Sequence, residues 1–271
     1  MKPELQKRVQ RYGWDKAAEY YENSWQEQLK PAHDKLIELA NAQPNESILD
    51  VAAGTGLVSF RLANEIGESG EVMATDISDE MVNIGNTYSI SKGVKNVQFK
   101  RMDAESIDSE KNTFDLATCA LSLMYFPDPD VALSEMYRTL KSKGRAVAAV
   151  WGSRKNCGWS EIFPIVDKRV KTDVCPMFFN LGESDVLKYP FENAGFKNIT
   201  LIKIETKLFY TSDEEACDAS FLGGPVAMAY SRFDEETKTE ARAEYIESIQ
   251  KYKTKKGYEI PGEFVICRGE K

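Results

Sequence analysis

The sequence of 271 residues is poor in the residues that build metal centres and disulfide frameworks. It has a single histidine, His33, so a zinc site would need cysteine or carboxylate ligands, and no such spacing occurs. We therefore expect no metal centre. No two cysteines form a C-x-x-C pair, and the five stand at Cys119, Cys157, Cys175, Cys217 and Cys267. An odd number of widely spaced cysteines is typical of a reduced, cytoplasmic protein rather than of a disulfide-bonded one.

The sequence also lacks long apolar runs, internal repeats and an excess of positive charge. No stretch approaches the roughly 18 apolar residues of a membrane span, and the polar start predicts no signal peptide. A net charge of −8 disfavours general binding of nucleic acid. We expect the basic clusters at 92–101 and 251–256 to be solvated surface. The length and a hydrophobic content of 42% suit one large domain, or a core domain with a cap.

Strand-like and helix-like stretches alternate over residues 46–152. Ser78 is a predicted N-cap, and Asp79 and Glu80 follow in the first turn, where carboxylates favour a helix start. The expected strands are 46–51, 71–76, 97–103, 114–121 and 145–151, and the expected helices are 57–66, the segment after Ser78, and 130–141. Apolar strands separated by helices predict an α/β fold with a doubly wound, mostly parallel sheet.

The alternation weakens outside this range, which predicts three parts. Residues 1–45 are expected to form helical segments ahead of the sheet, and 46–152 to form the core. Residues 153–271 are expected to complete the sheet and to build a cap from 153–180 and 211–256. Within this last part we predict a helix at 182–196, strands at 198–210 and 262–269, and two helical pieces around residues 223–225.

The segment "ILDVAAGTGLVSF" at 48–60 places a glycine loop directly after the first expected strand. Gly54 and Gly56 let the backbone approach a ligand, a device shared by NAD, FAD and other cofactors. Two details favour one ligand among these. Ser59 stands where the dinucleotide pattern has its third glycine, and Asp50 ends the strand beside the loop. A carboxylate repels a pyrophosphate but attracts the ammonium and sulfonium of S-adenosylmethionine.

The next two expected strands also end in aspartate. Asp76 follows Gly54 by 22 residues, close to the spacing of an acid that accepts hydrogen bonds from ribose hydroxyls. Asp103 ends the third strand and could accept a hydrogen bond from an adenine amino group. Strand-end aspartates are also common turn formers. Three of them at the carboxyl edge of an open sheet, together with the glycine loop, favour a cofactor site.

As a set, these motifs resemble the class I S-adenosylmethionine-dependent methyltransferases. The matching pieces are "ILDVAAGTG", "ATDISDEMV", "MDAESI", "FDLATCALSLMYFPD" and "LKSKGRAVAAVWG", in the family order. They are most similar to the branch of ubiquinone and menaquinone C-methyltransferases. The resemblance implies a Rossmann-like, seven-stranded sheet with an antiparallel last strand, and S-adenosylmethionine as cofactor. The cofactor site expected from the residues and the resemblance together comprises Tyr21, Asp50, Ala52, Gly54, Gly56, Asp76, Ile77, Met81, Asp103, Ala104, Cys119 and Ala120.

One departure concerns Ala52, which replaces the first glycine of the family loop. Alanine is common at that place among relatives, so binding should survive. A second departure is the segment 211–256, which is longer than the usual connection between the last two strands. It weakens any transfer of substrate identity from the quinone enzymes.

Methyl transfer is an in-line displacement that depends mainly on alignment, so a catalytic base is not required for every acceptor. His33 and Tyr125 are the candidates for such a role. His33 also fits a packed helix residue, since it shares a helix face with Leu36 and Ile37. Aromatic residues predict a flat or apolar small-molecule acceptor, although each could instead pack the cap. The candidate pocket residues are Trp25, Met124, Tyr125, Trp151, Trp159, Phe163, Phe178, Phe179 and Tyr230.

Several alternatives remain open at this stage. Cys157, Cys175 and Cys217 fall in the expected cap, and thiols gathered over a cofactor would resemble arsenite- or thiol-directed methyltransferases. Their spacings do not match that group, however, and buried cysteine is usually an apolar filler. A non-catalytic sensor of S-adenosylmethionine and a nucleotide-dependent oxidoreductase are two further candidates. An RNA or protein methylase is disfavoured by the net charge. The segment "CALSLM" lacks the N/D-P-P-Y signature of base and glutamine methylation. The favoured function is methyl transfer to a small organic acceptor.

Overall fold

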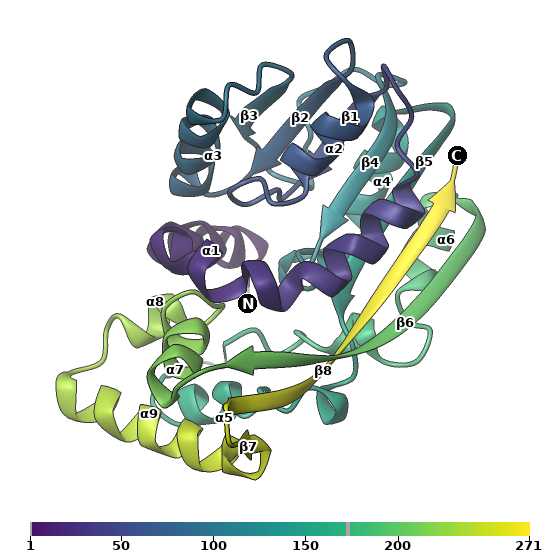
Figure 1. Cartoon of the computed structure of the whole chain (residues 1–271). Coiled ribbons are helices and arrows are strands. Elements are labelled where there is room, and N and C mark those ends of the chain that lie inside the picture. The colour runs from purple at the N-terminus through teal and green to yellow at the C-terminus, as the bar shows by residue number, and fades with distance from the viewer. Residues whose placement is uncertain (1, 172–173) are drawn as a thin grey trace.

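The computed structural model describes residues 2–171 and 174–271. Within these residues the strands form one eight-stranded sheet, in which seven strands follow the order β3-β2-β1-β4-β5-β8-β6 and β7 pairs with β8 (Figure 1). The strands are β1 (Ser47–Val51), β2 (Glu71–Asp76), β3 (Val97–Arg101), β4 (Phe114–Ala120), β5 (Leu140–Trp151), β6 (Lys197–Tyr210), β7 (Lys253–Thr254) and β8 (Gly257–Glu270).

The direction of the strands confirms the expected doubly wound α/β sheet. The first five strands pair in parallel, and β8 runs antiparallel to both β5 and β6. The antiparallel last strand agrees with the resemblance. The strand β7 is an addition of two residues that forms a short hairpin with β8. Ile48, Leu49 and Leu116 are fully buried, because helices pack on the sheet and leave no solvated face at its centre.

Helices connect and cover the strands. Ser78 caps α3 as expected, because its Oγ accepts a hydrogen bond from the N–H of Met81 at 3.1 Å. The α-helices are α1 (Pro3–Ala40), α2 (Ser59–Ile66), α3 (Asp79–Ser91), α4 (Pro129–Thr139), α5 (Ile162–Asp167), α6 (Lys188–Ala194), α7 (Asp213–Phe221), α8 (Ala227–Tyr230) and α9 (Glu235–Ile249). The 3-10 turns are η1 (Leu123–Tyr125), η2 (Arg154–Asn156), η3 (Asn180–Gly182) and η4 (Gln250–Tyr252).

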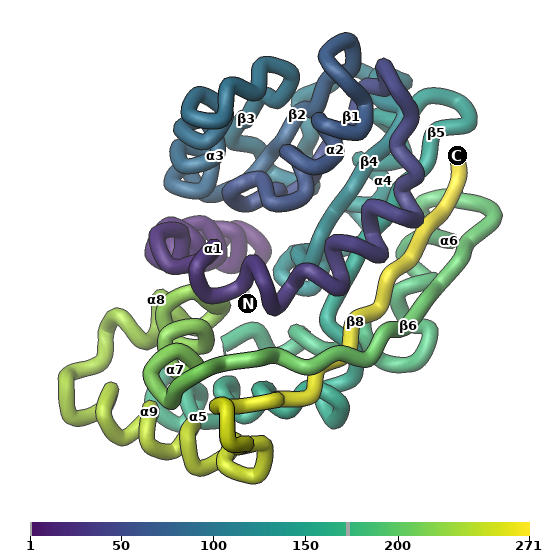
Figure 2. The backbone as a smooth tube through the Cα atoms, viewed as in Figure 1, coloured from purple at the N-terminus to yellow at the C-terminus, as the bar shows by residue number. Residues whose placement is uncertain are grey.

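Helix α1 links the sheet to the cap helices. It is one helix of 38 residues, rather than the separate helical segments that were expected. Figures 1 and 2 show that it changes direction, so that its first part lies between α3 and α8 and its second part runs toward β1. The helices α5, α7, α8 and α9 gather where β6 and β8 extend beyond the parallel strands (Figure 1).

Three local expectations are corrected by the structure. The helix expected at 182–196 is limited to α6, because Pro190 has no N–H to donate to an upstream turn of helix. The segment 211–256 forms three helices and β7 instead of two helical pieces. Asp234 begins the third of these helices by accepting a hydrogen bond from the N–H of Thr237 at 2.8 Å. Strands β5 and β8 begin at Leu140 and Gly257, each five residues before its expected start.

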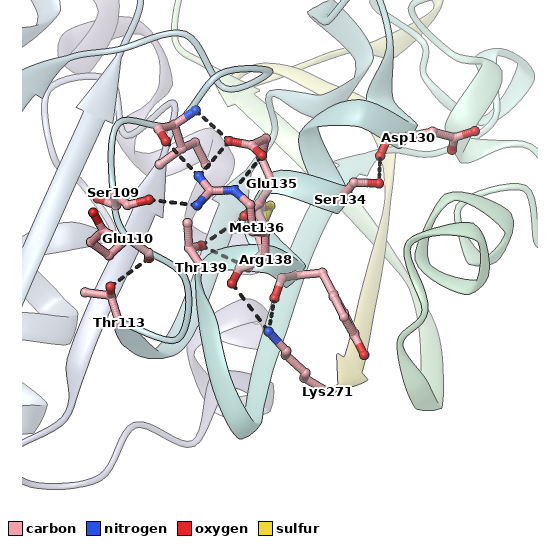
Figure 3. Close-up of polar contacts among 12 residues, drawn as sticks. Ser109, Glu110, Thr113, Asp130, Ser134, Glu135, Met136, Arg138, Thr139 and Lys271 are labelled. Atoms are coloured by element: carbon pink, nitrogen blue, oxygen red, sulfur yellow. Dashed lines mark hydrogen bonds and ion pairs between the residues drawn. The ribbon is translucent and has the colours of Figure 1, made fainter.

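Helix α4 fixes the segment that follows β3, as Figure 3 shows. The guanidinium of Arg138 donates to the carbonyl oxygens of Ile107 and Ser109, both at 2.8 Å. Glu135 pairs with Arg138 and accepts a hydrogen bond from the N–H of Ile107 at 2.9 Å. At the end of the same helix, Nζ of Lys271 donates to main-chain carbonyl oxygens (Figure 3). The segment leading from Asp103 is thus held by side chains that lie 28 or more residues further along the chain.

We predict that Arg138→Met lowers the free energy of unfolding by about 1–2 kcal/mol, because two carbonyl oxygens and Glu135 lose a charged donor. Urea unfolding monitored by circular dichroism measures this change. The matched control is Lys188→Met, which removes an exposed pair with Asp185 and should leave the unfolding midpoint unchanged. Equal midpoints for both variants would show that Arg138 does not anchor the segment.

Candidate active site

A cavity with about 720 Å³ of empty space, part of it open to solvent, lies at the carboxyl edge of the parallel strands. Helix α1 forms one wall, and the loops after β1, β2, β3 and β4 form the others. The lining residues are Lys7, Gln10, Trp14, Tyr21, Ala52, Gly54, Asp76, Ile77, Met81, Met102, Asp103, Ala104, Glu105, Leu121, Ser122, Tyr125, Phe126 and Pro127. This is the edge at which open α/β sheets bind ligands.

The cavity gathers most of the residues expected at the cofactor, but not all of them. Those that line it are Tyr21, Ala52, Gly54, Asp76, Ile77, Met81, Asp103 and Ala104. The remaining four expected residues lie outside the lining: Asp50, Gly56, Cys119 and Ala120. The loop after β4 reaches the cavity through Leu121 and Ser122, directly after the two residues expected there.

Asp50 is fully buried behind the glycine loop. Its Oδ2 accepts a hydrogen bond from Ser59 Oγ at 2.6 Å, and its Oδ1 accepts one from Thr118 Oγ1 at 2.7 Å. Ser59, at the place of the missing third glycine, therefore holds the acid at the next-to-last position of β1. Burial raises the pKa of Asp50 to about 6. An influence of this carboxylate on a ligand acts over a distance, since both of its oxygens bind hydroxyl groups of the protein.

Asp76 reaches the cavity from the end of β2 and holds two backbone amides. Its Oδ2 accepts a hydrogen bond from the N–H of Gly54, and its Oδ1 accepts one from the N–H of Ser78, both at 2.9 Å. Each carboxylate oxygen has a second lone pair, so the side chain keeps acceptor capacity for a ligand. Burial raises the pKa of Asp76 to about 6, against the opposing effect of these hydrogen bonds.

Asp103 lies two residues after β3, which ends at Arg101 and not at Asp103 as expected, and it pairs with the N-terminal helix. Its Oδ2 lies 2.6 Å from Nζ of Lys7, and the same nitrogen lies 2.7 Å from Oε2 of Glu105. Among the lining residues of the described chain, Lys7 carries the only positive charge, whereas Asp76, Asp103 and Glu105 are acids. The lining therefore has a negative balance, which suits a cationic ligand and opposes a pyrophosphate.

The two loop glycines have different neighbours. Both have positive φ, at +58° for Gly54 and +100° for Gly56. A Cβ on Gly54 would lie at the cavity, 3.6 Å from Cε1 of Tyr21. A Cβ on Gly56 would lie 2.6 Å from Cζ of Phe99, inside the packed core. The absence of a side chain at Gly54 thus leaves space for a ligand in the cavity, whereas at Gly56 it allows Phe99 to pack against the loop. Ala52 also has positive φ, at +53°, a strain that its family glycine would avoid.

The two candidates for a catalytic group differ in position. Tyr125 lines the cavity, and burial raises the pKa of its hydroxyl well above the usual value, so it stays protonated at neutral pH. His33 lies on α1 away from the lining, buried, and burial lowers its pKa to about 4. It matches the packed helix residue of the alternative interpretation.

Tyr125 is the only member of the candidate pocket set among the cavity's lining residues in the described chain. The others are buried: Trp25, Met124, Trp151, Trp159, Phe163, Phe178, Phe179 and Tyr230. Trp159 contacts Trp25 and Trp151 edge to face, with ring centroids at 5.8 and 4.8 Å. It also packs against Phe178 at 5.6 Å, so these rings form one aromatic core beneath the cap.

Several lining residues were not expected from the sequence. Lys7, Gln10 and Trp14 lie on the same face of α1 as the expected Tyr21, at spacings of three, four and seven residues, a signal that the helix period could have given. The other unexpected residues follow β3 or β4, and the sequence marks them only by their nearness to an expected strand end. They are Met102, Glu105, Leu121, Ser122, Phe126 and Pro127.

The cap cysteines contact different parts of the fold. Sγ of Cys157 lies against the carbonyl oxygen of Glu263, and Sγ of Cys217 against that of Arg242. Burial raises the pKa of these thiols, to about 12 for Cys157 and about 11 for Cys217. In the described residues no group of three or more His, Cys, Asp or Glu side chains is placed to hold a metal ion. Outside residues 1, 172 and 173, no helix has the length and apolar character to cross a membrane.

Comparison with known proteins decides the family. Residues 26–170, more than half of the chain, match the model of the ubiE/COQ5 methyltransferase family. The chain belongs to the ubiE/COQ5 methyltransferase family. It is an S-adenosylmethionine-dependent methyltransferase, and the predicted cofactor and enzyme class are confirmed.

Curated relatives in this family cover most of the chain. The ubiquinone/menaquinone biosynthesis C-methyltransferase UbiE of Teredinibacter turnerae is 32% identical over 176 residues, which cover 59% of this chain and 70% of the relative. The protein of the same name from Ectopseudomonas mendocina is 32% identical over 180 residues, which cover 60% of this chain and 70% of the relative.

Solved structures share the fold. The YcgJ protein of Bacillus subtilis superposes with a TM-score of 0.63 at 18% identity, over 89% of this chain and 98% of that one. The phosphoethanolamine N-methyltransferase 2 of Haemonchus contortus, solved with S-adenosylhomocysteine, superposes with a TM-score of 0.57 at 15% identity, over 87% of this chain and 51% of that one. At these identities the likeness concerns the fold alone. The cavity fits the family's cofactor, since it offers a buried acid for sugar hydroxyls, an open glycine and a negative balance of charge.

We predict that Gly54→Ala weakens binding of S-adenosylhomocysteine at least about tenfold, because the new methyl group enters the cavity, while strain at positive φ costs about 1 kcal/mol of stability. Gly56→Ala should instead destabilise the fold by about 2–3 kcal/mol, because its methyl group overlaps Phe99. Calorimetry and thermal unfolding of both variants measure the two effects. Indistinguishable behaviour of the two variants is the contrary result.

We also predict that affinity for S-adenosylhomocysteine falls about tenfold between pH 7 and pH 5. Asp76, with a pKa near 6, is then protonated and loses acceptor capacity. Over the same range the ligand-free protein should gain stability from Asp50 and Asp76, because their folded pKa values exceed the unfolded value of 3.8. These opposite signs separate loss of binding from acid unfolding. Calorimetry of wild type and Asp76→Asn tests this, and an equally steep pH dependence in the variant would rule out Asp76 as the titrating group.

Proposed function

We propose that the acceptor is a small, flat and largely apolar molecule bound between α1 and the loop after β4. Beyond the expected cofactor residues, the cavity is lined mainly by rings and apolar side chains. Trp14 and Tyr125 meet edge to face with ring centroids 5.2 Å apart. Leu121, Phe126 and Pro127 complete this part of the lining. Such a surface favours a planar ring over a charged or strongly hydrated acceptor.

We further propose that the methylated atom is a ring carbon of a hydroxylated, quinol-type aromatic compound. Two observations support this choice: the aromatic lining, and relatives at 32% identity that are named for C-methylation in ubiquinone and menaquinone biosynthesis. The thiol-directed alternative is not favoured, because the three cap cysteines have separate partners: Cys157 and Cys217 face different carbonyl groups, and Cys175 accepts a hydrogen bond from Gln10. The cytoplasmic location stays a prediction.

The proposed role of the protein is alignment and exclusion of water. S-adenosylmethionine supplies an activated methyl group when it is bound. We place its sugar at Asp76, its adenine near Asp103 and Ala104, and its amino acid part at the glycine loop beside Tyr21. The protonated hydroxyl of Tyr125 would donate a hydrogen bond to an oxygen of the acceptor and orient the ring. Positioning of this kind can be worth about 7–11 kcal/mol of the barrier.

A turnover assay that detects S-adenosylhomocysteine tests this proposal across a panel of acceptors. We expect product with dihydroxy- or polyhydroxy-aromatic compounds, and none with arsenite, simple thiols or tRNA. Mass spectrometry should place the new methyl group on carbon. Binding of S-adenosylmethionine without turnover of any aromatic acceptor would favour a sensor and contradict the proposed function.

Variants of the aromatic lining should affect the acceptor more than the cofactor. Tyr125→Phe should lower kcat/KM for the acceptor about tenfold, because it removes one hydrogen bond and keeps the ring. Trp14→Leu should raise KM for the acceptor, because it removes the opposing ring. Phe163→Leu, in the buried aromatic core, is the matched control and should leave KM unchanged. A cofactor affinity that falls as much as acceptor KM rises would place these residues at the cofactor instead.

A further inference from the structure

The first part of α1 presents two neighbouring rows of side chains to the rest of the molecule. One row lines the cavity and consists of Gln10, Trp14 and Tyr21. The second, which we call the polar row, makes charged and hydrogen-bonded contacts with the other elements and consists of Lys7, Arg11, Asp15 and Glu22. Of these four, Lys7 also lines the cavity. Residues spaced by four or seven positions share a helix face, so both rows are direct consequences of the sequence.

The first member of the polar row contacts the loop after β3. Nζ of Lys7 lies 2.6 Å from Oδ2 of Asp103 and 2.7 Å from Oε2 of Glu105. Glu105 also accepts a hydrogen bond from the N–H of Asp128 at 2.7 Å, which ties this loop to the start of α4. Lys7 therefore joins α1 to the loop that we place beside the adenine.

The next two members contact the end of the loop after β2 and the first turn of α3. Nε of Arg11 donates to Oδ2 of Asp79 at 3.1 Å. Oδ1 of Asp15 accepts hydrogen bonds from Oγ of Ser78 at 2.6 Å and from the N–H of Glu80 at 3.2 Å. Ser78 also donates its own N–H to Asp76, the acid that we place at the sugar.

The last member contacts the glycine loop after β1. Oε1 of Glu22 accepts a hydrogen bond from Oγ1 of Thr55 at 2.9 Å, and Thr55 is fully buried between Gly54 and Gly56. Going along α1, the polar row thus meets the loops after β3, β2 and β1 in turn. These are the three loops to which we assign the adenine, the sugar and the amino acid part of the cofactor.

The apolar attachment of this part of α1 comes from partly buried residues such as Trp14, which packs on Tyr125. Residues 2–16 contain no buried residue, and the first buried position of the helix is Ala17. Gly13 lies among them, although glycine is a poor helix former. A Cβ there would lie 3.7 Å from Cβ of Met228, an ordinary contact, so space does not require the glycine. Contacts between exposed charges are weak one by one and are screened by salt.

We propose that Lys7, Arg11, Asp15 and Glu22 are positioning residues that couple closure of the N-terminal helix to occupancy of the cofactor site. Closure requires the three loops to stand in one mutual arrangement, because a single helix face contacts all of them. A cofactor that fixes the same three loops therefore favours the closed helix, and the closed helix in turn strengthens cofactor binding. The proposal rests on the placement of the cofactor given above and extends it to Arg11, Asp15 and Glu22, which do not line the cavity.

The test uses Arg11→Glu in the full chain, because Arg11 contacts Asp79 and does not line the cavity. Calorimetry with S-adenosylhomocysteine should show an affinity about fivefold weaker than wild type at low salt. Arg11→Lys keeps the charge and should bind within about twofold of wild type. Lys16→Glu makes the same change of charge on the same helix, off the polar row, and should also stay within about twofold. In 0.5 M salt, the affinity of the wild type for S-adenosylhomocysteine should fall toward that of Arg11→Glu, because salt screens the ion pair.

Limited chymotrypsin cleavage after the exposed Tyr12 reports the state of the helix itself. S-adenosylhomocysteine should slow this cleavage at least about tenfold in wild type and clearly less in Arg11→Glu. Gly13→Ala should slow cleavage of the ligand-free protein, because it strengthens the helix without a clash. This variant also keeps the test valid if Arg11→Glu does not fold.

Two failures can be told apart. Unchanged affinity in Asp76→Asn would contradict the placement of the cofactor. If Asp76→Asn loses affinity as expected, but Arg11→Glu keeps the affinity, the salt response and the protection from cleavage of the wild type, the proposed coupling alone is wrong. In that case α1 is a fixed wall of the site.

Discussion

Two buried carboxylates at the ends of neighbouring parallel strands hold the glycine loop, and the rest of the site depends on this arrangement. Asp50 binds the hydroxyls of Ser59 and Thr118, and so joins β1 to α2 and β4. Asp76 binds the amides of Gly54 and Ser78, and so joins the loop to the start of α3. Burying an acid is unfavourable unless hydrogen bonds satisfy it, and here hydroxyl and amide donors do so. The cost remains visible in pKa values of about 6 for both groups.

The cavity has the negative charge that the sequence predicted, but different acids supply it. Asp50 was expected to face the cofactor's cations, but it lies behind the loop with both oxygens engaged. The lining instead carries Asp76, Asp103 and Glu105 against the single cation Lys7 among the described residues. A site of this balance attracts a sulfonium and an ammonium and repels a pyrophosphate. The family comparison, which assigns an S-adenosylmethionine-dependent methyltransferase, agrees with this electrostatic preference.

Local sequence patterns were sufficient to predict the sheet and much of the cofactor site. The features that they did not predict depend on packing between residues far apart in the sequence. The glycine loop and the acids Asp76 and Asp103 follow directly from strand ends, because parallel strands place these ends at one edge. The orientation of Asp50 depends on Thr118, 68 residues away, and the pairing of Lys7 with Asp103 spans 96 residues. The aromatic residues of the cap illustrate a second limit. Composition alone does not distinguish rings that line a pocket from rings such as Trp159 that fill a core.

The central claim is that the cofactor lies across the three loops after β1, β2 and β3, with its sugar on Asp76. A crystal structure of the complex with S-adenosylhomocysteine tests this most directly. The account predicts ribose oxygens within about 3 Å of the Asp76 carboxylate, the adenine between Met81 and Ala104, and Gly54 against the amino acid part. A ligand that instead contacts the Asp50 carboxylate directly, or that lies outside this cavity, would contradict it.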